Sequence, residues 1–228
     1  MDWNNDGKKD LVAGDSSGQV WLFLNGGTDK APVLAPAVPL KAGGKTILGQ
    51  APDYQRSMDG TYRMVAKTNT LMGIYSKIHV GDWNGDGLKD LLVGQDGPGN
   101  QNMLLYLNVG TASEPVLAAP VSIDGMLEPK LSRPSPYLVD WDGDGKQDLL
   151  CGTEQAAVYF FRNIGTAQQP KFARGVPLKL KGGDFASSYR CRIEVTDWNN
   201  DGKLDLLVGT ACSGAGGTRG NVWLFLGQ

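Results

Sequence analysis

The sequence predicts an all-β protein built from about four copies of one unit of four antiparallel strands. Three observations support this prediction. The 228 residues include 32 glycines and 12 prolines, which divide the chain into short segments separated by turns. The apolar runs are short and end at glycine, as buried strands do, and no long amphipathic helical stretch is found. One acidic loop recurs with similar segments on either side of it.

The acidic loop occurs four times, beginning at residues 2, 82, 140 and 197. The copies read D-W-N-N-D-G-K-K-D, D-W-N-G-D-G-L-K-D, D-W-D-G-D-G-K-Q-D and D-W-N-N-D-G-K-L-D. Oxygen-bearing side chains stand at loop positions 1, 3, 5 and 9, and glycine stands at position 6, where the chain must bend sharply. Short oxygen ligands at alternate positions suit a hard cation, and position 7 can add a backbone carbonyl. We therefore expect Ca²⁺ at about four sites.

The loop begins as an EF-hand loop does, but it ends differently. An EF-hand requires a bidentate glutamate at position 12 and a helix on each side. The residues found at position 12 are Ala13, Val93, Cys151 and Val208. Each lies in a short apolar run closed by glycine, which indicates a buried strand. The ligand set therefore closes with the aspartate at position 9, on the first residue of a strand.

Similar segments surround each loop. A strand is expected before three of the loops, at residues 77–80, 136–139 and 192–195. The short apolar strand follows each loop, and an aromatic-rich strand comes next, at residues 20–25, 103–108, 158–163 and 222–226. A turn then ends at Thr28, Thr111 or Thr166. A proline-bounded segment comes last and fits an outer edge strand, where a missing amide donor does the least harm.

The repeats predict a single β-propeller domain over residues 1–228. One four-stranded sheet cannot bury both of its faces, whereas sheets stacked around an axis can. A linear β-solenoid is the alternative, although its repeats are typically much shorter. Because the first unit lacks its first strand and the last unit lacks its last strand, three arrangements remain: a small four-bladed ring, a dimer that completes a larger ring, or a fragment of a longer protein.

The acidic loop, the D-L-L-V-G segment and the V-W-L-F-L strand together resemble the FG-GAP/VCBS repeats. These repeats form the integrin α-subunit-like, Ca²⁺-binding β-propellers and many bacterial extracellular propellers. The resemblance extends over essentially the whole chain, and the loops are its specific part. It implies that each loop joins the innermost strand of a blade to the second strand and binds Ca²⁺ there. Propellers of this family commonly close with more blades than this chain supplies.

The resemblance implies four side-chain ligands and one backbone carbonyl in each loop. In the first two loops these are Asp2, Asn4, Asp6, the Lys8 carbonyl and Asp10, and Asp82, Asn84, Asp86, the Leu88 carbonyl and Asp90. In the last two they are Asp140, Asp142, Asp144, the Lys146 carbonyl and Asp148, and Asp197, Asn199, Asp201, the Lys203 carbonyl and Asp205. The third loop carries an additional carboxylate, so we expect it to bind Ca²⁺ most tightly.

The first repeat is longer than the others, and the extra residues lie at about 42–77. This insertion contains a candidate ligand-binding set: Tyr54, Arg56, Tyr62 and Arg63. Aromatic faces stack on sugar rings, and guanidinium groups bind hydroxyls or carboxylates. The alternative is a solvated hairpin with a turn at Asp59-Gly60.

The single histidine, His79, is a further candidate because it stands three residues before the second loop. The matching residues of the next repeats are Tyr137 and Glu194, so this strand position could line a central channel or a cleft between blades. As a general base His79 would need a partner that the sequence does not identify, and the alternative is a packed or exposed histidine. The tryptophan at loop position 2 is expected to pack between blades.

The three cysteines do not form a disulfide framework. Cys151 replaces a valine or alanine of the other repeats and is expected to be buried. Cys191 and Cys212 flank the fourth loop and could pair only if their strands bring them together.

Composition excludes several classes of function. The net charge is −2 and no cluster of lysine and arginine suits nucleic acid. No apolar run is long enough to span a membrane. No signal peptide is recognised, so the chain is expected to be a mature or shortened segment of an extracellular or periplasmic protein, or else a cytoplasmic one. No serine-hydrolase, zinc-protease or phosphate-loop motif is found.

The function that these observations favour is a calcium-stabilised, lectin-like extracellular module that binds a glycan or a protein. One alternative is a polysaccharide lyase or hydrolase of the pectin-lyase-like propeller type, in which His79, Tyr62 or an arginine is recruited. Another is a structural repeat without catalytic activity. Whether the chain is an enzyme stays open, with the non-enzymatic function favoured. A homodimer that completes a ring is the expected assembly.

Overall fold

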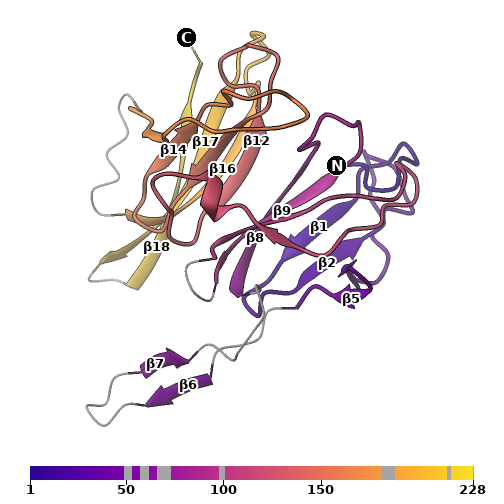
Figure 1. Ribbon diagram of the computed structural model, residues 1–228, viewed down its shortest axis with the longest axis horizontal. Helices are drawn as coiled ribbons and strands as arrows, with labels where there is room; N and C mark the ends of the chain where they lie inside the picture. The colour runs from indigo at the N-terminus through magenta and orange to yellow at the C-terminus, as the bar shows by residue number, and fades with distance from the viewer. Residues whose placement is uncertain are drawn as a thin grey trace. The chain divides into compact units, whose positions relative to one another are not determined.

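A computed structural model of the chain confirms the all-β fold (Figure 1). It describes residues 1–48, 53–56, 62–65, 73–97, 101–180, 188–214 and 217–227. The side chains of residues 53–56, 62–65, 188, 213–214 and 217–218 lie outside that description. The helical element in these ranges is one short 3₁₀ turn, η2 (Asp124–Met126). No helix in the described ranges has the length and apolar character that crossing a membrane requires.

The chain divides into two compact units, which are described separately. The first unit contains Met1–Asp82 and Gly87–Asp124, and the second contains Trp83–Asp86 and Gly125–Gln228. Each unit holds two of the four repeat sheets.

The first unit contains a three-stranded and a four-stranded antiparallel sheet. The three-stranded sheet has the order β1 (Leu11–Gly14), β2 (Val20–Phe23), β3 (Val38–Pro39). The four-stranded sheet has the order β11 (Val121–Ser122), β10 (Met103–Tyr106), β9 (Asp90–Asp96), β8 (Ile74–Gly81). Two hairpins lie between them in the sequence: β4 (Lys41–Ala42) with β5 (Lys45–Thr46), and β6 (Asp53–Arg56) with β7 (Tyr62–Val65).

The second unit repeats this design. Its four-stranded sheet has the order β12 (Ser135–Val139), β13 (Asp148–Gly152), β14 (Val158–Phe161), β15 (Val176–Pro177). Its three-stranded sheet has the order β16 (Ser188–Thr196), β17 (Asp205–Gly214), β18 (Gly217–Phe225), seen as neighbouring ribbons in Figure 1. β17 and β18 form the longest hairpin of the four repeats.

The strand pattern of the repeat is therefore confirmed. The two middle sheets have four strands, and the first and last sheets have three. The sheet at the start has no strand before its acidic loop, and the sheet at the end has no strand after β18 in the described residues. The closing of these sheets into a propeller stays a prediction.

Each unit has its own apolar core, formed by alternate residues of the strands. In the first unit the core includes Val20, Leu91, Val93, Leu104 and Tyr106. In the second unit it includes Leu150, Val158, Cys191, Leu206 and Val208. The described strands thus bury the apolar runs that the sequence marks as strands.

Two of the three cysteines are buried, and the third, Cys212, is partly exposed. Cys151 is fully buried, as expected. Cys191 and Cys212 lie on neighbouring strands, but both are free thiols. Burial raises the pKa of the Cys191 thiol to about 11, so it stays protonated at neutral pH.

The position-2 tryptophans pack against apolar residues in three of the four loops, although packing between blades stays a prediction. Trp3 belongs to the core of the first unit, and Trp141 packs against the core of the second. Trp83, which the second unit contains, lies with its ring centroid 5.6 Å from that of Phe172. Trp198 differs, because 58% of its surface is exposed.

Candidate metal centres

The four acidic loops share one backbone path. Position 6 has a positive φ in every loop, between 82° and 85°, at Gly7, Gly87, Gly145 and Gly202. A Cβ atom at these glycines would meet nothing within 4 Å, so the backbone angle and not crowding requires glycine. Position 4 also has a positive φ, at Asn5, Gly85, Gly143 and Asn200. Asparagine and glycine are the residues that adopt this angle most readily.

Backbone amides hold the position-1 carboxylate in the centre of the loop. In the third loop the N–H groups of Asp144 and Gly145 donate to Asp140 at 3.0 and 2.9 Å. In the fourth loop those of Asp201 and Gly202 donate to Asp197 at the same two distances. The first loop has the same pair of contacts onto Asp2. The turn thus gathers its oxygens before any cation is bound.

The position-5 carboxylate caps the next bend. It accepts the N–H of position 7, at 2.9 Å from Lys203 to Asp201 in the fourth loop. This hydrogen bond is the largest reason that the pKa of Asp201 is lowered. The carboxylate is therefore ionised at neutral pH, as a metal ligand must be.

The division between the two units falls inside the second loop, so its two parts are described separately. In the first unit the N–H of Gly87 donates to Asp82 at 2.8 Å. In the second unit the N–H of Asp86 donates to Asn84 at 3.3 Å. Both contacts repeat those of the other loops.

The position-9 aspartate has a structural role that the sequence analysis missed. Asp10 is buried, and its two oxygens accept the N–H groups of Trp3 and Asn25, each at 2.8 Å. Asp148 joins Trp141 to Asn163 in the same way, and Asp205 joins Trp198 to Gly227. Asp90 likewise accepts the N–H of Asn108. This carboxylate therefore ties the start of the loop to the end of the third strand.

The residue after the third strand completes this connection in three repeats. Asn25, Asn108 and Asn163 are buried, and each side-chain oxygen accepts two backbone N–H groups of the following turn. The recurring asparagine before G-T is the signal that could have identified it.

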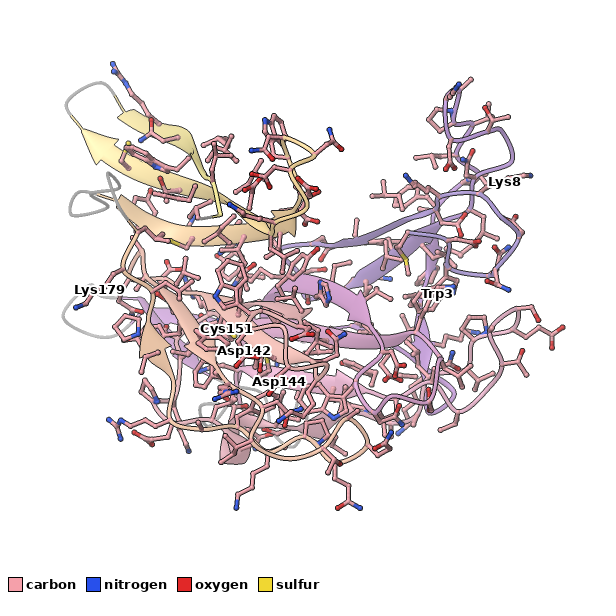
Figure 2. All side chains as sticks on the ribbon, turned by 90° about the horizontal axis from the view of Figure 1, so that it is seen from above. Trp3, Lys8, Asp142, Asp144, Cys151 and Lys179 are labelled. Atoms are coloured by element: carbon pink, nitrogen blue, oxygen red, sulfur yellow. The ribbon has the colours of Figure 1, made fainter. Side chains whose placement is uncertain are left out.

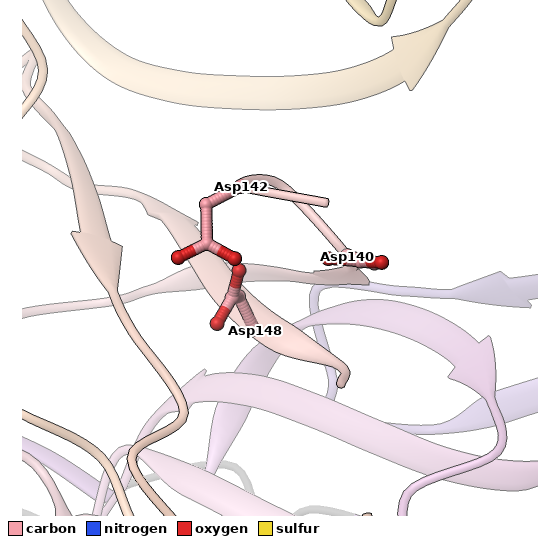
Figure 3. A group of neighbouring side chains, drawn as sticks. All are labelled: Asp140, Asp142 and Asp148. Atoms are coloured by element: carbon pink, nitrogen blue, oxygen red, sulfur yellow. The ribbon is translucent and has the colours of Figure 1, made fainter. Parts of the chain in front are cut away.

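Two observations show that the loops suit a cation. In the first loop the side-chain oxygen of Asn4 is buried and has no hydrogen-bond partner, although it stands at ligand position 3. In the third loop, carboxylate oxygens of Asp140, Asp142 and Asp148 all lie within 4.8 Å of one another (Figure 3). Burial raises the pKa of Asp148, and the Asp142 charge adds to the rise. A cation would remove this repulsion between carboxylates.

The third loop differs because two basic side chains already contact its carboxylates. Arg162 Nε lies 2.6 Å from Asp142, and Arg162 Nη2 lies 3.4 Å from Asp144. Lys146 Nζ lies 3.0 Å from Asp144 and also donates to the backbone oxygen of Asn163. The Lys146 hydrogen bond is the largest cause of the lowered pKa of Asp144. Figure 2 labels Asp142 and Asp144 on this loop.

These contacts weigh against the third loop binding Ca²⁺ most tightly, and the order of affinities stays a prediction. The other three repeats have asparagine at loop position 3. At the position of Arg162 they have leucine: Leu24, Leu107 and Leu226. The third repeat replaces both, so that the additional carboxylate of Asp142 is matched by the guanidinium of Arg162. A metal ion must displace this internal cation from two of its own ligands.

The candidate residues in the insertion lie in the β6–β7 hairpin. Arg56 pairs with Tyr62 and Gln55 pairs with Arg63 in the backbone register, while Tyr54 pairs with Met64. The described backbone thus forms a hairpin, which agrees with the alternative interpretation of a solvated hairpin. The side chains and the Asp59-Gly60 turn lie outside the described residues.

His79 lies on β8 of the first unit and is partly buried. Burial lowers its pKa to about 4, so its imidazole is neutral and weakly basic at pH 7. The equivalent residues of the second unit contact one another, since the Tyr137 hydroxyl donates to Glu194 Oε1 at 3.1 Å. This strand position therefore faces the neighbouring repeat in the second unit.

Comparisons with known proteins agree with the repeat pattern. Residues 140–208, which include the third and fourth loops, match the FG-GAP-like repeat family. This confirms the prediction of an FG-GAP/VCBS repeat protein. No curated protein sequence matches the chain.

Among solved structures, the chain is similar to a lectin of Agrocybe aegerita described as specifically recognising non-reducing terminal N-acetylglucosamine. The identity is 19%, the TM-score is 0.41, and the match covers 98% of this chain and 64% of the lectin chain. No inference about the ligand of this chain follows from a likeness of this size.

Proposed function

We propose that this FG-GAP/VCBS repeat protein is a calcium-stabilised binding module for a glycan or protein ligand and that it acts outside the cytoplasm. The observation that carries the calcium part is the buried, unpartnered oxygen of Asn4 in a loop whose carboxylates are already turned inward. A buried acceptor without a partner is unfavourable, and a bound cation would satisfy it.

The loop positions have different roles in this proposal. Positions 1, 3 and 5 supply oxygens for the ion, and position 7 supplies its backbone carbonyl. Position 9 joins the loop to the third strand through two backbone amides. When bound, the ion would neutralise the gathered carboxylates. Its expected effect is to fix the relative positions of the strands that the loop connects.

Thermal unfolding with Ca²⁺, with Mg²⁺ and with EDTA tests this proposal. Each occupied site should stabilise the native state by about 2.7 kcal/mol at a hundredfold excess of Ca²⁺ over Kd. We expect EDTA to lower the Tm markedly and Mg²⁺ to restore it poorly, because Mg²⁺ requires a near-ideal octahedral site. An unchanged melt after verified removal of metal would refute calcium stabilisation.

A matched pair of variants tests the first loop. Asn4→Ala removes the unpartnered oxygen and should reduce the Ca²⁺-dependent rise in Tm. Asn5→Gly is the control, because glycine occupies the same loop position at Gly85 and Gly143 and accepts the left-handed backbone. Equal calcium responses in the two variants would contradict the assignment of Asn4.

A further inference from the structure

A second polar site lies at the other end of the sheets in the second unit. Arg133 precedes β12 and Glu154 follows β13, whereas the third acidic loop joins the opposite ends of these strands. Arg190 and Arg192 stand near the start of β16, and the fourth loop follows its end. β12 has five residues, and at about 3.4 Å per residue this separates the two sites by about 17 Å.

One glutamate lies among these three arginines. Glu154 Oε1 accepts Arg133 Nη1 at 3.3 Å and Arg190 Nε at 3.2 Å. Arg192 donates to the Cys191 carbonyl and has no carboxylate partner in the described residues. Burial lowers the pKa of Arg192, the nearby Glu154 carboxylate opposes this shift, and the neighbouring arginines add to it. The cluster thus has more positive than negative charge, part of it held away from water.

The backbone fixes the cluster in place. Arg133 and Arg190 have positive φ angles of 46° and 61°, which non-glycine residues adopt rarely. The N–H groups of Arg190 and Cys191 donate to the carbonyls of Glu154 and Thr153 at 3.0 and 2.9 Å. A shift of register between Tyr189 and Arg192 also changes the direction of the side chains at this point.

A groove opens beside the two arginines of β16. It has a volume of about 530 Å³ and is lined by Arg190, Arg192, Thr210 and Asn221. Gly209 and Gly220 form part of its wall and present no side chain. A Cβ atom on either glycine would approach no atom closer than 3.6 Å, so packing does not require glycine there.

We propose that this arginine groove, formed by Arg190, Arg192, Thr210 and Asn221, binds the carboxylate or sulfate group of an acidic saccharide. Planar guanidinium groups bind such oxyanions through paired hydrogen bonds. Asn221, an exposed amide in the groove lining, provides both a donor and an acceptor for a sugar hydroxyl. This proposal names a ligand class for the binding module proposed above, but it does not depend on calcium.

The test measures binding of three probes by calorimetry: an oligogalacturonate, a sulfated oligosaccharide and an uncharged oligosaccharide of equal length. Binding of either anionic probe, and not of the uncharged one, supports the proposal, and the preferred anion identifies carboxylate or sulfate as the ligand group. Failure of both anionic probes would overturn it. Equal binding of a single-stranded oligonucleotide of the same charge would overturn the saccharide assignment.

Variants locate the binding site. Arg192→Gln should lower the affinity about tenfold or more, because a charge-assisted contact is lost, and Arg192→Lys should lower it less. Arg174→Gln is the control, since Arg174 is an exposed arginine of the same unit that pairs with Glu128. Unchanged affinity in Arg192→Gln would refute the groove as the site.

The two proposals fail in different ways. The calcium-dependent rise in Tm should be the same in Arg192→Gln as in the unmodified protein, which also shows that the variant is folded. If the unmodified protein shows no calcium-dependent rise in Tm, calcium stabilisation is refuted, but the measured binding of the anionic saccharides still stands. Because uronates themselves bind Ca²⁺, the calorimetric titrations with the two anionic probes are repeated at one fixed concentration of free Ca²⁺.

Discussion

Replacing Arg162 by leucine should raise the affinity of the third loop for Ca²⁺. The guanidinium contacts two expected ligands, with Nε at 2.6 Å from Asp142 and Nη2 at 3.4 Å from Asp144. Both contacts must open before these oxygens can turn to a metal ion. Leucine stands at this position in the other three repeats, so the strand end can accept it. Arg162→Leu therefore removes the guanidinium and introduces only a side chain that the other repeats already have at this position.

The exposure of the pair limits the size of the effect. The side chain of Arg162 is 53% exposed and that of Asp142 is 26% exposed. An ion pair with this much contact with water contributes about 0.2–1 kcal/mol. Opening it thus weakens binding by up to about fivefold, and removing a positive charge beside the site adds to the gain. We expect Arg162→Leu to bind Ca²⁺ about two to ten times more tightly.

The assay needs a background in which the third loop reports alone. Asp6→Asn, Asp86→Asn and Asp201→Asn weaken the other loops, and calorimetry then compares this background with and without Arg162→Leu. The gain should shrink as salt concentration rises, because the pair is exposed to screening. Adding Asp142→Asn to both proteins gives a double-mutant cycle in which the gain should shrink, with the remainder due to the contact of Arg162 with Asp144. Equal or weaker affinity in Arg162→Leu would refute competition by the arginine.

Three further outcomes are expected. Asp10→Ala should lower the Tm even in EDTA, with a loss of about 2–4 kcal/mol in the free energy of unfolding, because two buried backbone amides lose their acceptor. Asp6→Ala should lower the Tm only when Ca²⁺ is present. Equal Tm values of the two variants in EDTA would contradict this. The free energy of unfolding should fall by about 1–2 kcal/mol as the pH drops from 6.5 to 5, because the histidine of the unfolded chain takes up a proton, whereas the partly buried His79 of the native state, with its pKa of about 4, stays neutral; an equal slope in His79→Gln would refute this. The protein should be a dimer by light scattering at micromolar concentration with Ca²⁺, weakened by EDTA and by Val222→Lys, because the outer strand β18 exposes Val222 (77%) and Leu224 (41%); a monomer at every concentration would reject the dimer.

The sequence predicted the local structure well because local rules govern it. The left-handed angle at loop position 6 follows from glycine and the bend that the loop requires, as Gly145 shows. The apolar run after each loop became a strand, as β13 shows for Asp148–Gly152. The position-9 aspartate was identified only as a ligand, although its backbone hydrogen bonds are its clearest role in the structure.

The contacts between distant segments could not be predicted in the same way. Asp142 and Arg162 meet because β13 pairs with β14, with Leu149 opposite Phe161. The third repeat alone has aspartate and arginine where the other repeats have asparagine and leucine. This joint difference could have indicated a contact, but only the pairing of the two strands shows that the side chains meet. At the arginine groove, the irregular register before Arg192 breaks the alternation of side chains on which sequence patterns rely.

The same backbone connection is found in both units, but its side chains differ. In the first unit the N–H of Tyr75 donates to the carbonyl of Ser16 at 3.2 Å, and in the second unit that of Arg190 donates to the carbonyl of Glu154 at 3.0 Å. Tyr75 and Arg190 also share a left-handed φ near 60°. The fold therefore requires this strained backbone but not the ion pair, because the first unit forms the connection with neutral side chains. The ion pair between Arg190 and Glu154 is therefore a feature of the second unit that the backbone connection does not need, whereas the acidic loops at the other end of the sheets keep nearly one sequence in all four repeats.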